Sequence, residues 1–395
     1  MLLLLFLQAI TVTFGHAGVL RARQTTCPAV PDDPTLLPVP ALPDPFTFYD
    51  GTAVKDQSQW SCRQNEISSF FQQFELGTKP PVPDAVTASL SGTTLGITSV
   101  VGNSSMNFNV TIKLPATGSA PWPALIVYGA ASIPIPDGVA TIVFDNSGMA
   151  QQTNTQSRGK GLFYDLYGSD ATAAATTAWA WGVSRIIDAL VLVPEAQIDP
   201  TRVGVTGCSR NGKGAFIAGA LDDRIALTIP QESGSGGASC WRLSDDMLAR
   251  NISTQTASEI VGENVWFSER FADFANSVPT LPVDHHLLAG LVAPRGLLVI
   301  ENTDFVWLGP WSAWGCMTAG RRTYEALGKQ DSMGFSQVGG HNHCQFPASQ
   351  QPELEAFVAR FLLGQNVSTD VFKTDLTEGF DQSKWAPWET PDLTA

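Results

Sequence analysis

The stretch VGVTGCSRNGKGA (residues 203–215) joins a β-branched run to a Gly-spaced, helix-like segment through Gly-Cys-Ser. A serine on a sharp strand-to-helix turn stands above the sheet, and the helix N-terminus points free N–H groups toward developing negative charge. The pattern therefore favours Ser209 as a nucleophile. The second glycine, Gly212, stands one place later than in the usual G-x-S-x-G spacing, and a helix N-cap is the alternative role for the serine.

Strand and helix patterns alternate on both sides of this turn. Three polar-alternating strands are predicted at 86–91, 94–101 and 107–113, and short buried strands follow from residue 122 onward. Helices are predicted at 64–76, 169–193, 312–328 and 350–363. Such alternation predicts an α/β fold with a mostly parallel central sheet between helix layers.

The ends of the chain differ in composition from this central part. Residues 1–17 hold an apolar run ending in small residues, which predicts a secretory signal peptide. Residues 18–50 predict a Pro-rich arm, residues 51–365 the catalytic domain and residues 366–395 a C-terminal tail. Four Asn-x-Ser/Thr sequons fit a secreted, extracellular glycoprotein: Asn103, Asn109, Asn251 and Asn366.

The net charge of −14 argues against nucleic acid and anionic membranes as partners. No stretch after the signal approaches the length of a membrane-spanning helix, and we expect a monomer. Six cysteines in a secreted chain favour three disulfides, although their spacing leaves 15 pairings open. No C-x-x-C spacing occurs and histidines are few, so we expect no metal site.

The base that a nucleophilic serine requires has few candidates. His285 and His286 stand in VDHHLLAG, a predicted helix start, where a capping or core role is expected. His341 and His343 lie in the Gly-rich loop QVGGHNHCQF after the last predicted strand, where this architecture places its base. Position alone does not choose between these two.

The acid that orients the base also has two candidates. Glu232 ends the strand after the nucleophile, whereas Asp304, with Glu301 nearby, follows the strand LLVIEN. Either could instead cap the next helix. From position alone Asp304 is slightly favoured.

Three segments in order resemble the motifs of carbohydrate esterase family 15, the glucuronoyl esterases: GVTGCSRNGKGA, IPQESGSGGASCWR and GGHNHCQFP. The resemblance covers roughly residues 25–365. It implies an α/β-hydrolase fold, a three-layer αβα sandwich, with no metal and no cofactor. It also implies hydrolysis of esters between 4-O-methyl-glucuronic acid of glucuronoxylan and lignin alcohols.

The resemblance assigns roles by position. It implies Ser209 as nucleophile, His343 as base because a cysteine follows it, and Glu232 as acid in place of Asp304. Arg210 resembles an oxyanion-hole residue, with a further donor expected from the loop YGAAS. The positions that hold the sugar are Lys213, Gln255, Glu263 and Trp307. The implied disulfides are Cys27–Cys62, Cys208–Cys344 and Cys240–Cys316.

Two other functions remain open at this stage. One is a different secreted esterase acting on acetyl or feruloyl groups. The other is a carbohydrate-binding protein that kept the fold without catalysis.

Overall fold

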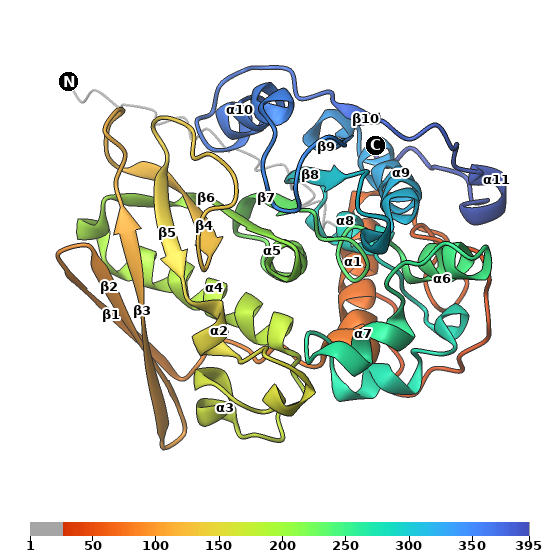
Figure 1. Cartoon of the computed structure of the whole chain (residues 1–395). Coiled ribbons are helices and arrows are strands. Elements are labelled where there is room, and N and C mark those ends of the chain that lie inside the picture. Colours follow the sequence, from red (N-terminus) through yellow and green to blue (C-terminus); the bar gives the residue numbers. More distant parts are fainter. Residues whose placement is uncertain (1–26, 395) are drawn as a thin grey trace, which may run out of the picture.

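The computed structural model describes residues 27–394. The predicted signal peptide, residues 1–17, lies outside the described part. Within that part, ten strands form one sheet in the order β1-β2-β3-β5-β4-β6-β7-β8-β9-β10 (Figure 1). The strands are β1 (Ala85–Ser91), β2 (Thr94–Val101), β3 (Ser104–Lys113), β4 (Trp122–Tyr128), β5 (Ala140–Phe144), β6 (Ile198–Cys208), β7 (Ile225–Gln231), β8 (Gly296–Asn302), β9 (Met333–Val338) and β10 (Phe372–Thr374).

The sheet is antiparallel at one side and parallel elsewhere. β1, β2, β3 and β5 pair antiparallel in succession, and from β5 across to β10 every pair is parallel. The antiparallel wing alternates buried and exposed residues, as in β3, while β8 is buried throughout. The burial patterns differ because helices cover the parallel strands on both faces.

Helices cover the two faces of the sheet unequally. The helices are α1 (Gln57–Phe71), α2 (Asn146–Met149), α3 (Leu162–Tyr167), α4 (Ala175–Leu192), α5 (Arg210–Leu221), α6 (Trp241–Ala249), α7 (Ala257–Glu263), α8 (His286–Val292), α9 (Pro310–Ala326), α10 (Gln351–Phe361) and α11 (Gln382–Trp385). Helices α4, α5, α8 and α9 pack together beside the parallel strands, while α10 contacts β7 and β8 through a separate apolar cluster (Figure 1). The predicted three layers are present, with α10 the main helix of the thinner layer.

Two predicted boundaries shift in the structure. The helix expected at 64–76 begins at Gln57, where Asp56 caps it by accepting from the Gln59 N–H, and it continues as a π-helical turn, η1 (Gln72–Leu76). The helix expected from 169 begins at Ala175. Residues 168–174 instead form a loop, in which Gly168 caps the end of α3 and Ala174 caps the start of α4.

The two ends of the described chain join the body of the protein. The Pro-rich arm buries Leu42, Phe46 and Phe48 in the main core. Residues 366–395, predicted as a tail, supply β10 to the edge of the sheet, and Trp385 in this segment is buried and accepts a hydrogen bond from the Leu42 N–H. Sequence reasoning missed this strand because it spans three residues.

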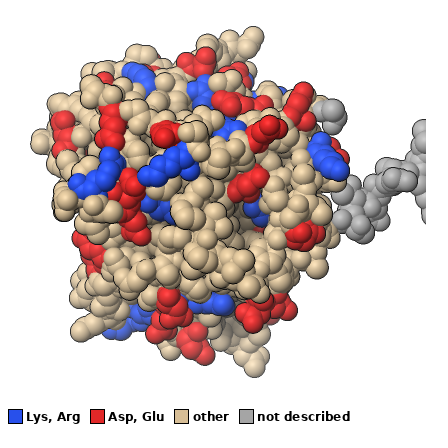
Figure 2. Space-filling model, turned by 90° about the vertical axis from the view of Figure 1, so that its right-hand side faces the viewer, with Lys and Arg blue, Asp and Glu red and all other residues tan. Residues whose placement is uncertain are grey.

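The surface mixes acidic and basic side chains. Figure 2 shows red and blue residues interspersed over one face, without a continuous basic field. Among the helices of residues 27–394, none combines the length and apolar character that crossing a bilayer requires. All four sequon asparagines are exposed.

Candidate active site

Ser209 occupies a strained turn between β6 and α5. Its φ of 59° and ψ of −127° lie in a region that non-glycine residues rarely adopt, and its side chain makes no capping hydrogen bond. Gly212 explains the unusual spacing, because a Cβ there would stand 2.6 Å from the carbonyl oxygen of Gln231 in β7. The helix-cap alternative is therefore wrong: the turn holds the hydroxyl away from the helix N–H groups.

Glu232 follows β7 directly and lies beside this turn. The Ser209 N–H donates to the Gln231 carbonyl at 2.9 Å, so the two strand ends are joined one residue before the glutamate. Glu232 also has a positive φ of 43°, and its N–H donates to the Ile300 carbonyl at 2.6 Å. Its carboxylate is fully buried, which fixes one orientation for the group it contacts.

Of the two loop histidines, His343 makes the direct contact with this carboxylate. Its Nδ1 lies 2.7 Å from Glu232 Oε2, which also accepts from the Cys344 N–H at 3.0 Å. The His341 Nδ1 lies 3.7 Å from Glu232 Oε1 and 3.2 Å from the amide of Asn302. The His341 side chain is 4% exposed and that of His343 25%, so His343 has the access to solvent that a proton-transfer group needs.

The positional preference for Asp304 does not hold in the structure. Asp304 is exposed, and its Oδ2 accepts a hydrogen bond from the Gly340 N–H at 2.6 Å. It thus stabilises the loop that carries the histidines, while Glu232 contacts the imidazole.

The predicted disulfide pairing is present in all three cases: Cys27–Cys62, Cys208–Cys344 and Cys240–Cys316. The second joins the residue before Ser209 to the residue after His343. Its two sulfurs and a ring nitrogen of His343 lie within 4.8 Å of one another. In the described chain this is the one group with metal-ligand geometry, and both of its sulfurs are already bonded to each other.

Lys213 lies one turn along α5 from the nucleophile and is 2% exposed. Its Nζ donates to the Ser233 carbonyl at 2.6 Å and lies 5.8 Å from the ring centre of Trp266. Burial lowers the pKa of Lys213 to about 8, although Glu301 and Glu263 act in the opposite direction. The ammonium group is therefore fixed beside the turn that holds Glu232.

Glu301, at the end of β8, supports that same turn. Its Oε1 accepts from the Ser233 N–H at 2.8 Å, the Ser233 hydroxyl at 3.0 Å and the Gly234 N–H at 3.2 Å. Burial raises the pKa of Glu301 to about 7, and the charge of Glu232 adds to the effect. The sequence pointed to Glu301 only as a neighbour of Asp304.

The remaining predicted sugar contacts form one connected group. The Gln255 amide donates to Glu263 Oε2 at 2.8 Å, and the Gln255 N–H donates to the Trp307 carbonyl at 3.0 Å. Trp307 is 40% exposed, and its ring centre lies 5.0 Å from that of His343. Gln255 precedes α7, which Glu263 ends, and their side-chain hydrogen bond brings the two residues together.

Arg210 and its neighbour complete the nucleophile turn. Arg210 is exposed at the start of α5, and its charge contributes to lowering the pKa of Lys213. The Asn211 amide donates to the Tyr128 carbonyl at 3.1 Å and accepts from the Asn146 amide at 2.9 Å. The turn is thereby attached to the end of β4, where the loop YGAAS begins.

Sequence reasoning missed the aromatic residues around these groups. Trp266 is 5% exposed and donates from Nε1 to Gln152 at 2.9 Å, and Phe305 packs 5.7 Å from the His343 ring. Trp266 stands three residues after Glu263, and Phe305 two residues before Trp307. In the sequence, the only indication of these two aromatic residues was their position close to a predicted sugar contact.

His285 and His286 have core roles, as expected. His285 pairs with Glu75 at 2.6 Å and both side chains are 0% exposed. Burial lowers the pKa of His286 to about 4, and its Nε2 contacts the Pro43 carbonyl at 2.8 Å.

The fold and the serine, histidine and glutamate at the ends of its parallel strands define an α/β-hydrolase of the serine hydrolase class. A family model described as "Glucuronyl esterase, fungi" matches residues 97–328. The chain belongs to this family, the glucuronoyl esterases of carbohydrate esterase family 15.

Several proteins are similar to this one over about nine-tenths of the chain. The 4-O-methyl-glucuronoyl methylesterase of Hypocrea jecorina is 54% identical over 94% of this chain and 80% of its own length. The enzyme of the same name from Schizophyllum commune is 54% identical over 89% of this chain and 91% of its own length.

Solved structures agree with this relationship. The glucuronoyl esterase catalytic domain from Hypocrea jecorina has a TM-score of 0.90 at 54% identity, covering 92% of this chain and 99% of its own. A serine-to-alanine mutant of the Sporotrichum thermophile glucuronoyl esterase, in complex with methyl 4-O-methyl-β-D-glucopyranuronate, has a TM-score of 0.90 at 51% identity, covering 93% of this chain and 100% of its own.

Proposed function

We propose that the protein is a secreted serine esterase that hydrolyses esters of 4-O-methyl-glucuronic acid, with Ser209, His343 and Glu232 as its catalytic residues. The observation that supports this most directly is the 2.7 Å contact of His343 with the buried Glu232. The Cys208–Cys344 disulfide links the residue after this histidine to the residue before the strained Ser209. The natural substrate class is the ester between glucuronoxylan and lignin alcohols.

The reaction proceeds by acyl transfer in two steps. His343 removes the proton of Ser209 while the serine oxygen bonds to the ester carbonyl carbon. Glu232 stabilises the imidazolium that forms. The tetrahedral intermediate collapses with loss of the alcohol, which takes the proton from His343. Water, deprotonated by the same imidazole, then attacks the carbonyl carbon of the acyl-enzyme. The bond from this carbon to the Ser209 oxygen breaks, the serine oxygen takes the proton from His343, and the free uronate leaves.

The negative oxygen of each intermediate forms at the N-terminus of α5. The backbone N–H of Arg210 is the first donor available there, and the Arg210 guanidinium adds positive charge. Asn211 holds the turn against β4, which keeps that N–H in place.

The acid half of the ester binds beside Lys213 and the Gln255–Glu263 pair. A hydrogen-bonded amide and carboxylate offer both donors and acceptors to sugar hydroxyls, and the exposed ring of Trp307 offers a flat apolar surface to the sugar C–H groups. The alcohol half then points to solvent, so bulky lignin-like alcohols are accepted. We also propose that the four exposed sequons carry glycans and that the protein acts as a monomer.

The test compares hydrolysis of benzyl D-glucuronate with that of an aryl acetate, for the wild type and for Ser209→Ala. The uronate ester is expected to be the better substrate, and its hydrolysis is expected to vanish in the variant. Preference for the acetate would point to an acetyl esterase. Absence of Ser209-dependent hydrolysis of either ester would point to a carbohydrate-binding protein.

A further inference from the structure

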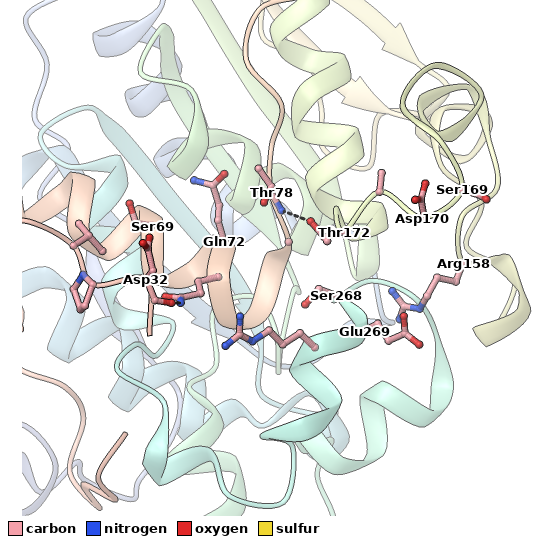
Figure 3. Close-up of a pocket in the computed structure, with 16 residues that line it drawn as sticks. Asp32, Ser69, Gln72, Thr78, Arg158, Ser169, Asp170, Thr172, Ser268 and Glu269 are labelled. Atoms are coloured by element: carbon pink, nitrogen blue, oxygen red, sulfur yellow. Dashed lines mark hydrogen bonds between the residues drawn. The ribbon is translucent and has the colours of Figure 1, made fainter. Parts of the chain in front are cut away.

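Polar groups that the proposed reaction does not use gather at more than one place in the molecule. Figure 3 shows a cavity of about 680 Å³, with Gln72 and Thr78 on one side and Arg158 and Glu269 on the other. None of the proposed catalytic residues lines this cavity, and Arg158 already donates from both terminal nitrogens to a backbone carbonyl at 3.2 Å. The second place is Glu301 at the end of β8, whose carboxyl group directly contacts the turn after β7.

The turn after β7 has a backbone conformation that needs support. Strands β7 and β8 remain paired as far as Gln231 and Ile300, so the turn begins where the pairing of the sheet ends. Glu232 and Gly234 have φ of 43° and 54°, and the first of these values is rare for a residue other than glycine. In turns of this kind, successive backbone N–H groups converge and form a concave site for an oxygen acceptor. The conformation of Glu232 therefore depends on what occupies that site.

Two consecutive residues of β8 accept hydrogen bonds from three consecutive N–H groups of this turn. The Ile300 carbonyl accepts from the Glu232 N–H at 2.6 Å. Glu301 Oε1 accepts from the N–H groups of Ser233 and Gly234 at 2.8 and 3.2 Å, and from the Ser233 hydroxyl at 3.0 Å. Both donor residues are buried and Glu301 is 1% exposed. Without the carboxyl group, three donors would stand in the protein interior without their acceptor, which is unfavourable.

Ser233, the middle residue of the turn, is also held from its other side. Its carbonyl accepts from Lys213 Nζ at 2.6 Å, and its hydroxyl oxygen accepts from the Ala238 N–H at 2.9 Å. Burial lowers the pKa of Lys213 to about 8, and the charge of Glu301 acts against that decrease. The turn is thus fixed between α5 and β8, and Glu301 supplies the side-chain contacts from β8.

The contacts with the turn do not require Glu301 to be charged. Burial raises the pKa of Glu301 to about 7, although the hydrogen bonds from Gly234 and Ser233 act in the opposite direction. A protonated carboxyl group keeps an oxygen that accepts hydrogen bonds, so the turn is held in both protonation states. The amide oxygen of a glutamine offers the same acceptor at the same distance from the backbone, whereas alanine offers none.

We propose that Glu301 is a positioning residue for the acid of the triad: its carboxyl group fixes the turn that directs Glu232 to His343. The inference rests on the proposed function, since it takes Glu232 as the acid. Glu301 acts through Glu232, whose Oε2 makes the 2.7 Å contact with His343 Nδ1. The end of β8, near which position alone placed the acid, thus contributes the support of the acid on the neighbouring strand.

The test compares three substitutions of Glu301 by their kcat for benzyl D-glucuronate. In Glu301→Ala, kcat is expected to fall about 10-fold to 100-fold, because a misplacement of about 1 Å from a change outside the reacting groups has effects of that size. Glu301→Asp keeps the charge but is one methylene shorter, so a loss of about threefold to tenfold is expected. Glu301→Gln keeps the reach without the charge and is expected to recover kcat to within about threefold of the wild type.

Glu66→Ala is the matched control for the loss of a buried carboxyl group. Glu66 in α1 is 2% exposed and accepts from the Tyr49 N–H at 3.1 Å. This variant is expected to lower the temperature of unfolding and to leave kcat unchanged. All kcat values are measured at a temperature where thermal unfolding shows each variant to be folded, and Glu301→Asp with Glu301→Gln decides the outcome if Glu301→Ala does not fold.

A double-mutant cycle separates positioning of the acid from a general loss of structure. In a chain that already carries Glu232→Ala, Glu301→Ala or Glu301→Asp is expected to change kcat by less than about twofold, because the group that Glu301 positions is then absent.

A wild-type kcat in both Glu301→Ala and Glu301→Asp would overturn the positioning role. A larger loss in Glu301→Gln than in Glu301→Asp would overturn it too, because charge and not reach would then matter. Equal losses with and without Glu232 would show that the effect does not pass through the acid. The proposed function is judged separately, by Ser209-dependent hydrolysis of the benzyl ester in the otherwise unmodified chain.

Discussion

Two histidine–glutamate pairs in this molecule have nearly the same geometry and opposite surroundings. His285 Nε2 lies 2.6 Å from Glu75 Oε1, and His343 Nδ1 lies 2.7 Å from Glu232 Oε2. The first pair is 0% exposed on both sides, whereas the His343 side chain is 25% exposed. The distance between the partners thus does not distinguish the buried pair from the proposed catalytic one, whereas the exposure of the imidazole does.

The rings around each imidazole reinforce the contrast. His285 is enclosed by Trp241 and Phe71, with ring centres at 5.2 and 6.0 Å, so no substrate can reach it. His343 has the exposed Trp307 beside it, and the Cys208–Cys344 disulfide joins the residue after it to the residue before the strained Ser209. Changes to the first pair should act on folding, and changes to the second on turnover.

The largest expected effect is on turnover in Glu232→Ala. Without the carboxylate the imidazole loses its orientation and the stabilisation of its charged form, so kcat for benzyl D-glucuronate is expected to fall about 10⁴-fold. Asp304→Ala is the control, with a change below about threefold, since Asp304 contacts the Gly340 N–H and not the ring. Steady-state kinetics measures both, and the reverse ranking would restore Asp304 as the acid.

The next effect is on stability, in the double variant Cys208→Ala, Cys344→Ala. The disulfide joins cysteines 136 positions apart in the sequence, and its loss is expected to lower the free energy of unfolding by about 2–5 kcal/mol. Denaturant unfolding measures this loss. Full turnover in the folded double variant would show that the cystine has no part in placing Ser209 and His343.

Glu75→Gln tests the buried pair. Removing one partner of a fully buried ion pair is expected to cost about 3–5 kcal/mol of stability. Although burial lowers the pKa of His285, Glu75 raises it, and the net direction is upward. The contribution of the pair is therefore complete below pH 6.5 and is lost as the pH rises through that raised pKa.

Thermal unfolding of Glu75→Gln and of the wild type at several pH values measures the change in stability. The kcat of both proteins is measured at temperatures where they are folded. A loss of kcat without a loss of stability would contradict the division between the two pairs.

The smallest expected effect is on the pH dependence of stability, in Glu301→Gln. Burial raises the pKa of Glu301 from its ordinary 4.5 to about 7, so the folded state retains a proton that the unfolded state has released. Stability contributed by this group therefore falls as the pH rises from about 4.5 to about 7.

Glutamine keeps an oxygen for the three donors that Oε1 accepts and removes the titration. The decrease in Tm between pH 5 and pH 7.5 should be smaller in the variant than in the wild type. An identical decrease in both proteins would show that Glu301 does not titrate in this range.

Much of the fold could be predicted from local patterns. The antiparallel strands expected at 86–91, 94–101 and 107–113 occur at 85–91, 94–101 and 104–113, because alternation of buried and exposed residues is a strong local signal. The strand at Phe372–Thr374 could not be predicted, since three residues hold no periodicity and its pairing with β9 is a tertiary contact.

In the candidate site, too, some features could be predicted from the local sequence and others could not. The turn at Ser209 could be predicted because glycines and strand propensity are signals in the local sequence. The choice of Glu232 over Asp304 depended on the resemblance to a known family. Contacts such as Glu301 with Ser233 join residues 68 positions apart. Nothing in the local sequence of either residue specifies such a partner.

The Cys208–Cys344 bond also gives the chain a covalent topology. Residues 208–344 form a closed ring that contains Glu232, the Gln255–Glu263 pair and Trp307, as well as the exposed loop at Asn251. A single peptide-bond cleavage inside this ring opens it without releasing a fragment. Ser209 and His343 would then remain parts of one molecule, so a protease would have to cut the ring twice to remove any of it.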